Sequence, residues 1–209
     1  MVDDLSLPLQ RGMPGYPGYP GYDTEQLQEH GTDGKVSHRI EMNTHQGTHI
    51  DAPAHFIEGG QTVGELSLET LQGPARVVDL RAYRGEAITA EILSAEAPDL
   101  TADRVLLLTG DVDARFDDQQ FYDAAAVLTA DAAGWLIDCG VSLVGNDFLT
   151  EGIETDDRPV HHALLGDEIP IVEYLCNSGA IIDQTTVEFR CLPLHTPGLE
   201  ASPVRAVAL

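Results

Sequence analysis

The chain has 209 residues, of which 43% are hydrophobic, so it is long enough to bury one sizeable core and needs no second domain. Its 35 acidic residues face only 11 basic ones, giving a formal charge of -24. Such a charge would repel phosphate backbones and anionic lipid surfaces, which argues against nucleic acid and membranes as partners.

The N-terminal segment, residues 1–30, is expected to form an arm of a single domain spanning residues 1–209. Residues 1–10 carry neither the basic start nor the apolar stretch of a secretory signal, so we expect a cytoplasmic protein. Pro-Gly-Tyr repeats over residues 14–22 favour successive turns that present amphipathic tyrosine rings. The arm could close over a site, in its own or a neighbouring subunit, and the chain alone does not decide this.

Hydrophobic periodicity predicts the strands. Residues 36–43 alternate, with Val36, Ile40 and Met42 on one side, and predict a strand that leads into a histidine-rich segment. Four apolar runs predict further buried strands, at residues 75–80, 104–110, 141–145 and 203–209.

Helices are expected between these strands. Thr89 can cap a helix to about Ala97, and Thr129 can cap one to Cys139 that Gly140 ends. Residues 159–166 are bracketed by Pro and Gly and predict a short helical turn. Strands interleaved with short helices predict an α/β or α+β architecture, with a mixed sheet large enough to curl on itself.

The strongest functional signal is HQGTHIDAPAH, residues 45–55, which holds four potential metal ligands or proton carriers: His45, His49, Asp51 and His55. Gly47 and Pro53 argue against a helix here. In a straight strand the two leading histidines would lie roughly 13 Å apart, at about 3.3 Å per residue, which is too far to bind one ion. A bend at Gly47 would bring the two imidazoles together.

Imidazole nitrogen and carboxylate oxygen suit zinc or manganese, and fewer than four protein ligands leave a position for water. Water activated in this way attacks carbonyl carbon near neutral pH. A single histidine would more simply be a solvated loop residue, but the density of this cluster favours a metal centre.

A second candidate segment, residues 159–175, supplies His161, His162 and Glu173. A lone Glu in the apolar run IPIVEYL would be costly if buried unpaired, so a nearby cation would account for it. From the residues alone, a Glu that faces solvent on a half-buried strand is an equally good explanation. The remaining histidines have no cluster around them and are expected to be ordinary surface or hydrogen-bonded side chains: His30, His38 and His195.

The pattern HxGTHxDxPxH in residues 45–55 resembles the signature of the cyclase family, which includes bacterial kynurenine formamidase. The likeness extends to LSLPLQRGMPGYPG near the start, LLLTG at 106–110, VGND at 144–147, VHHALL at 160–165 and SPVRAVAL at the end. The resemblance implies a swivelling β/β/α fold with a central barrel-like mixed β-sheet flanked by short helices. It also implies a homo-oligomer, a dimer or tetramer, with one or two zinc ions per subunit, or manganese in their place.

The resemblance implies a role for each site residue. By motif position, His45, His49 and Asp51 would bind the first metal, and Asp51 would bridge to a second metal bound by His161 and Glu173. His55 would be the catalytic acid and base. His161 is preferred to His162 because it directly follows Val160 in the family pattern, and a slip of one residue would exchange them.

The implied activity is hydrolysis of a carbon-nitrogen amide bond, with N-formylkynurenine, an intermediate of tryptophan catabolism, as the first candidate substrate. Relatives that resemble kynurenine formamidase often carry an aromatic residue after the Thr-Gly of LLLTG, where this chain has Asp111. That departure keeps open a cyclic amide such as isatin, or cyclisation of a polyketide-like compound. A structural or sensory metal-binding protein is a third alternative, but such zinc sites usually recruit cysteine, and neither candidate segment contains one.

Two compositional features bear on the environment. The three cysteines are odd in number and lack metal-like spacing, which a reduced setting explains most simply. Lys35 is the one lysine beside ten arginines, a balance typical of a halophilic surface on which salt screens self-repulsion.

Overall fold

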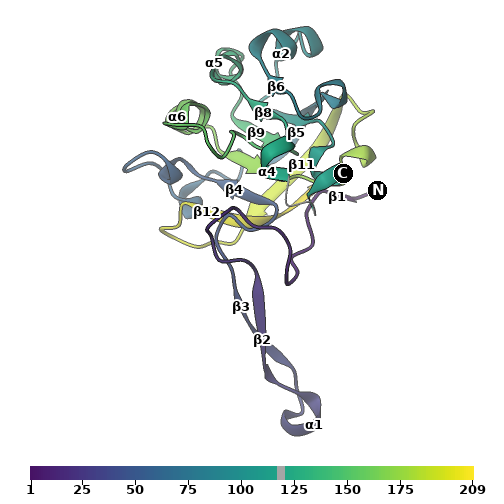
Figure 1. Ribbon diagram of the computed structural model, residues 1–209, viewed down its shortest axis with the longest axis vertical. Coiled ribbons are helices and arrows are strands. Elements are labelled where there is room, and N and C mark those ends of the chain that lie inside the picture. The colour runs from purple at the N-terminus through teal and green to yellow at the C-terminus, as the bar shows by residue number, and fades with distance from the viewer. Residues whose placement is uncertain (117–120) are drawn as a thin grey trace.

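The computed structural model describes residues 1–116 and 121–209 (Figure 1). Its centre is a mixed sheet closed into a barrel, with neighbouring strands in the order β12 (Ala201–Ala208), β11 (Thr186–Pro193), β5 (Gln72–Asp79), β7 (Arg104–Leu108), β9 (Leu143–Asn146), β10 (Ile171–Glu173) and β4 (His49–Asp51). β4 pairs back with β12 and closes the ring. β5, β7, β9 and β10 pair in parallel, and the other pairings are antiparallel. The expected α/β fold with a barrel-like mixed sheet is therefore confirmed.

Strand β7 shows why the central strands read as continuous apolar runs. All five of its residues are buried. Leu106 and Leu108 belong to the core inside the barrel, whereas Val105 and Leu107 belong to the core beneath the helices. Because successive side chains of a strand point to opposite faces, a strand covered on both faces is apolar throughout.

Three predicted helices, α2 (Ala90–Glu96), α5 (Ala130–Asp138) and α6 (Pro159–Gly166), cover one side of the barrel (Figure 1). Thr89 caps α2, since its Oγ1 accepts a hydrogen bond from the Ile92 amide at 3.3 Å. Thr129 stands at the start of α5, but its hydroxyl donates to the Ile88 carbonyl instead of capping the helix. None of the described helices is long and apolar enough to cross a membrane.

The remaining elements are short. They are β1 (Asp3–Asp4), β2 (Asp23–Gln28), α1 (His30–Asp33), β3 (Ser37–Glu41), β6 (Ala87–Ile88), α3 (Asp111–Arg115), α4 (Phe121–Ala124), β8 (Val127–Leu128), and the 3-10 turns Pro53–His55, Val63–Glu65, Arg81–Tyr83 and Ser178–Ala180. β1 extends the sheet by pairing with β12. The N-terminal segment is thus tied to the barrel near its start before it leaves as an arm.

Strands β2 and β3 form an antiparallel hairpin that projects from the barrel, with α1 at its tip (Figure 1). The strand predicted over residues 36–43 is therefore present, as β3, but its apolar side is exposed. Ile40 is 57% exposed and Val36 47% exposed. The alternation correctly indicated a strand. Among the described residues, none covers the apolar face of this strand.

Three barrel strands were not predicted as strands. β4 and β10 have only three residues each, and β11 interrupts its inward Val187, Phe189 and Cys191 with outward charged side chains. The run predicted at 141–145 becomes a strand two residues later, at β9. Short or polar-faced strands depend on their neighbours in the barrel more than on their own composition.

Candidate functional site

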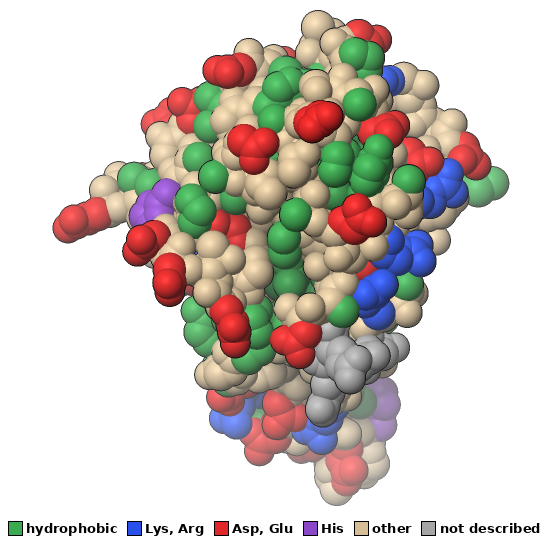
Figure 2. Space-filling view, turned by 45° about the horizontal axis from the view of Figure 1, so that its top comes forward, with side chains coloured by type: hydrophobic (Ala, Val, Ile, Leu, Met, Phe, Trp, Pro, Cys, Tyr) green, Lys and Arg blue, Asp and Glu red, His purple; other side chains and the backbone are tan. Residues whose placement is uncertain are grey.

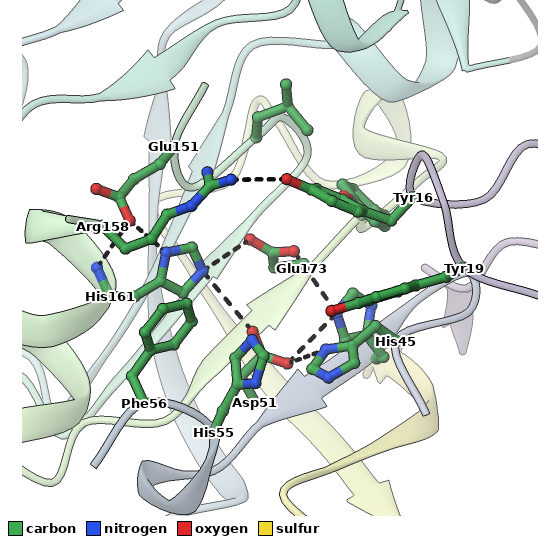
Figure 3. Close-up of a pocket in the computed structure, with 13 residues that line it drawn as sticks. Tyr16, Tyr19, His45, Asp51, His55, Phe56, Glu151, Arg158, His161 and Glu173 are labelled. Atoms are coloured by element: carbon green, nitrogen blue, oxygen red, sulfur yellow. Dashed lines mark hydrogen bonds and ion pairs between the residues drawn. The ribbon is translucent and has the colours of Figure 1, made fainter. Parts of the chain in front are cut away.

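A cavity of about 180 Å³ lies where β4, β10, α6 and the N-terminal arm meet (Figure 3). Its lining contains every site residue predicted from the sequence, together with aromatic, apolar and charged side chains from other segments. The whole set of lining residues is Tyr16, Tyr19, His45, His49, Asp51, His55, Phe56, Leu149, Glu151, Arg158, His161, Glu173 and Tyr174. Segments far apart in the chain therefore contribute to one site.

The expected bend at Gly47 is present. Gly47 has a φ of +64°, in the left-handed region that glycine adopts at little cost. A Cβ at this position would lie 2.8 Å from Leu9 Cδ2, so a larger residue would also meet the N-terminal segment. The bend brings the rings of His45 and His49 to a centroid distance of 5.1 Å.

The pairing of β10 with β4 places Glu173 beside His49. β10 runs antiparallel to β4 with Glu173 opposite His49 and Ile171 opposite Asp51, so the carboxylate of Glu173 meets the histidine. Glu173 Oε2 lies 3.5 Å from His49 Nε2. Glu173 is buried, which rules out the solvent-facing alternative.

Helix α6 separates its two adjacent histidines. His161 is buried, and its Nε2 lies 3.7 Å from Glu173 Oε1 and 3.9 Å from Asp51 Oδ2. The adjacent His162 is exposed. The geometry thus places His161, and not His162, beside the carboxylates.

The three imidazoles beside the carboxylates of Asp51 and Glu173 are those of His45, His49 and His161. Each has one ring nitrogen next to an oxygen that belongs to neither of these two carboxylates. His49 Nδ1 lies 2.8 Å from the Gly47 carbonyl, and His161 Nδ1 is hydrogen-bonded to Glu151. Nε2 of both rings then faces the carboxylates. A carbonyl can only accept, so Nδ1 of His49 carries the proton and its Nε2 is free to act as a metal ligand.

His45 completes the arrangement at the rim of the cavity. Its Nε2 lies 3.4 Å from Glu200, and its Nδ1 lies 2.9 Å from Asp51 Oδ1. Glu200 is itself held by the Thr44 hydroxyl, which donates to it at 2.6 Å. Fixing one nitrogen of an imidazole orients the other toward a bound metal.

The ligand atoms fall into two groups that share Asp51. Atoms of His45, His49 and Asp51 lie within 4.8 Å of one another, as do atoms of Asp51, His161 and Glu173. His49 Nε2 and Asp51 Oδ1 are buried 3.4 Å apart, and neither makes a well-oriented hydrogen bond although His45 Nδ1 is also close to the carboxylate, an arrangement that a cation between them would resolve. The donor set therefore fits one or two divalent ions.

The field at the site also favours a cation. Burial opposes the charged forms of all these groups, yet the neighbouring histidines hold the pKa of Asp51 well below its ordinary value and lower the pKa of Glu173. Burial likewise opposes the imidazolium of His161, but Glu151, Glu173 and Asp51 raise the pKa of His161 to about 10. Carboxylates that stabilise a proton on this ring would equally stabilise a metal ion beside it.

His55 stands apart from both ligand groups. It ends the 3-10 turn Pro53–His55, and its ring centroid lies 4.2 Å from that of His45. Burial lowers the pKa of His55 below its ordinary value of 6.5, despite the opposing charge of Asp51. A half-buried, neutral imidazole at the cavity wall is suited to accept a proton near neutral pH.

Several cavity residues were missed from the sequence: Tyr16, Tyr19, Phe56, Glu151, Arg158 and Tyr174. The tyrosine repeat was a visible signal for the arm, and Figure 3 shows Tyr16 and Tyr19 beside the histidines. Glu151 accepts hydrogen bonds from the first amides of α6, including that of Val160 at 2.8 Å. Its isolated position in the sequence gave no signal. His30, His38 and His195 are exposed, as expected.

Asp111 does not face the cavity, so the substrate argument drawn from it is wrong. Its side chain is fully buried, accepts hydrogen bonds from the amides of Gly85 and Ala126, and lies 3.2 Å from Arg115 Nε. These contacts tie two loops to α3. Asp111 therefore carries no information against an aryl substrate.

Comparisons with known proteins show what the chain is similar to. A family model described as putative cyclase matches residues 3–151. Kynurenine formamidase of Salinibacter ruber is 36% identical over 169 residues, covering 80% of this chain and 77% of that protein. Cyclase-like protein 1 of Arabidopsis thaliana is 31% identical over 188 residues, covering 87% of this chain and 72% of its own length.

Solved structures extend the likeness over the whole chain. A potential metal-dependent hydrolase with cyclase activity is 28% identical and superposes with a TM-score of 0.83, covering 100% of this chain and 96% of that one. Isatin hydrolase A of Labrenzia aggregata, at 23% identity and a TM-score of 0.88 over 100% of this chain and 93% of its own, shows that the fold is shared.

Proposed function

The chain belongs to the cyclase family and is a metal-dependent amide hydrolase, and we propose that its substrate is an aryl formamide, with N-formylkynurenine as the first candidate. The observation that carries this proposal is the placement of two overlapping metal-ligand groups on the wall of a cavity with aromatic side chains. The similarity to kynurenine formamidases at 31% to 36% identity supports the same substrate class.

The ligands proposed for the first ion are His45, His49 and Asp51, and those for the second are Asp51, His161 and Glu173. Divalent ions at these positions would lower the pKa of water and polarise the carbonyl oxygen of the amide. Zinc is proposed because three imidazoles and two carboxylates suit it, and manganese would accept the same donors. Because the ligand groups line an open cavity, the arrangement favours catalysis over a closed structural or sensory site.

His55 is the proposed general acid and base. Its neutral ring would take a proton from the attacking water and return it to the leaving amine, so that the amine departs uncharged. The backbone between Pro53 and His55 holds the ring at the cavity wall in a 3-10 turn. Phe56 packs against the His55 ring at a centroid distance of 4.4 Å, and Tyr19 lines the same cavity, so both would exclude water from an aryl group bound there.

An aryl substrate is favoured by the walls of the cavity. Tyr16, Tyr19, Phe56 and Tyr174 supply four aromatic rings, which prefer offset or edge-on contact with another ring. Asp111 is buried away from the cavity, so its presence in place of an aromatic residue is no argument against an aryl substrate. The likeness to isatin hydrolase rests on the fold, so it gives no separate reason to prefer a cyclic amide.

The test combines metal analysis with an assay on one preparation. Metal-loaded protein should release formate from N-formylkynurenine, and removal of metal by a chelator should abolish this, with recovery when zinc is returned. Bound metal without formate release would refute the aryl formamide and move the substrate to another amide. Full activity of the metal-free protein would refute the proposed site.

We propose in addition a cytoplasmic homo-oligomer with a halophilic surface. The three cysteines are free, which suits a reduced setting. Acidic side chains outnumber basic ones over the visible face in Figure 2. The projecting β2–β3 hairpin exposes Leu27, Val36 and Ile40, and a second copy of the chain would cover them in a dimer. Sedimentation of the protein at high salt tests the oligomer, and a monomer at micromolar concentration would refute it.

A further inference from the structure

Arg158 is the one arginine or lysine among the described residues that line the cavity. It stands immediately before α6, with a left-handed φ of +43°. Its guanidinium donates to the carbonyls of Gly152 at 2.7 Å and Ile153 at 2.8 Å, which fix the preceding loop. It also donates to the Tyr16 hydroxyl at 2.8 Å. In Figure 3 the pair formed by Arg158 and Tyr16 lies across the drawn site from Asp51 and His55.

The charge of Arg158 is not balanced by a neighbour. Within the described residues no carboxylate lies within 4.0 Å of its guanidinium, although the chain has 35 acidic residues. Most other arginines do have such a partner: Arg11, Arg39, Arg76, Arg81, Arg104, Arg115 and Arg205. A half-buried cation that faces a cavity without a counter-ion favours an anionic group of the ligand.

The guanidinium keeps donors for such a group. Arginine has five N–H donors, and the three hydrogen bonds above use three of them. The backbone carbonyls hold the side chain in one orientation, so less conformational entropy is lost when it binds a carboxylate. The Tyr16 hydroxyl, which accepts from Arg158, can in turn donate its own proton to the same anion.

We propose that Arg158, positioned by Tyr16, determines specificity by binding a carboxylate of the substrate at the end remote from the scissile amide. This inference rests on the proposed function and narrows it to aryl formamides whose side chain carries a carboxylate, as the amino-acid group of N-formylkynurenine does. The aromatic rings would hold the aryl group, and the arm that carries Tyr16 would recognise the acidic tail. The substrate carboxylate would then bind where the hydrogen bond between Arg158 and Tyr16 already joins the N-terminal arm to the start of α6.

The test compares two substrates that share the reacting group. N-formylkynurenine carries an amino-acid carboxylate, and 2′-formamidoacetophenone has the same aryl formamide without it. For R158Q we expect kcat/KM on N-formylkynurenine to fall about 10- to 100-fold, mainly through KM, the range for a lost hydrogen bond to a charged group. On 2′-formamidoacetophenone the variant should match the wild type. R158K should lose less than R158Q.

Two further variants separate recognition from folding. Y16F keeps the backbone contacts of Arg158. Its kcat/KM on N-formylkynurenine should fall less than that of R158Q, and its kcat/KM on 2′-formamidoacetophenone should again match the wild type. R190Q removes the same charge from an exposed position on β11 and should leave both activities unchanged. Metal content and thermal midpoint are measured for every variant.

The outcomes distinguish the two proposals. Equal losses by R158Q on both substrates, with the wild type active, would overturn the role of Arg158 and indicate loop support or binding of released formate. No hydrolysis of either formamide by metal-loaded wild type would instead refute the aryl formamide, and the carboxylate site would fall with it.

Discussion

Buried carboxylates control the histidines of this site at the level of single atoms. Glu151 is held by the first amides of α6 and in turn holds Nδ1 of His161. The proton on that nitrogen then leaves Nε2 to face Asp51 and Glu173. A side chain that is not itself a proposed ligand can therefore decide whether a neighbouring histidine binds the metal.

Glu151→Gln should weaken metal binding. Glutamine can still accept from the Val160 amide but cannot accept charge-assisted hydrogen bonds as a carboxylate does, so His161 becomes a poorer ligand. We expect metal affinity to fall by about 10- to 100-fold in a chelator competition titration. His162→Ala is the matched control, because that ring is exposed on the same helix and should leave affinity unchanged. An E151Q protein that binds metal as tightly as wild type would contradict the role of Glu151.

His55→Ala should strongly reduce turnover while metal stays bound. Loss of a general acid and base typically costs about 10²- to 10⁴-fold in kcat. Removal of His49, a proposed ligand, should instead lose metal and activity together. Kinetics combined with metal analysis separates the two, and metal-free H55A protein would make His55 a ligand.

The activity of the wild type should also report the protonation of His55. Burial lowers the pKa of His55 below 6.5, so the ring is neutral and able to accept a proton above that pKa. kcat/KM should rise with pH through a value below 6.5 and then level off. A pH profile whose acidic limb lies above 6.5 would exclude His55 as the group that must be deprotonated.

At the level of elements, the sequence predicted those parts whose pattern is local. The apolar runs of β5 and β7, the cap of α2 at Thr89 and the bend at Gly47 depend on nearby residues, and each is present. The pairing of β10 with β4 depends on barrel closure, which no periodicity encodes. The sequence therefore suggested Glu173 as a ligand but did not show what would bury it, and it gave no sign of Glu151 or Arg158.

Gly47→Ala tests the bend. An alanine at φ +64° costs about 1–2 kcal/mol, and its Cβ would lie 2.8 Å from Leu9 Cδ2, so the free energy of unfolding should fall by at least that amount. Gly134→Ala is the control, because a Cβ there meets nothing within 4 Å inside α5 and should raise stability by up to about 1 kcal/mol. Denaturant unfolding measures both. Equal stability of G47A and wild type would show that the bend does not need glycine.

For the whole molecule, the dominant quantity is the net charge of -24. Acidic side chains are scattered over the face shown in Figure 2, and basic ones are fewer. Mutual repulsion of these charges destabilises the compact state most where salt is low. The metal site gains from the same field, since negative potential draws cations toward the cavity.

Salt should therefore stabilise the fold. The screening length falls from about 10 Å at 0.1 M to about 3 Å at 1 M, so the thermal midpoint should rise by more than about 4 °C over this range, a shift that roughly 1–2 kcal/mol produces in a chain of this size. A comparison of chloride and sulfate salts at equal ionic strength separates the two effects of salt. Charge screening depends on ionic strength, whereas exclusion from the protein surface is stronger for sulfate.

A charge-reduced variant makes the salt test specific. Glu58, Glu86 and Glu188 are exposed and form no ion pair within the described residues, so replacing all three by glutamine removes repulsion without removing a contact. This variant should be more stable than wild type at low salt and gain less from added salt, because fewer charges remain to be screened. Full stability and activity of the wild type in low salt, with no gain in molar salt, would refute the halophilic surface. An equal salt response of both proteins would assign the effect to exclusion of salt from the protein surface instead.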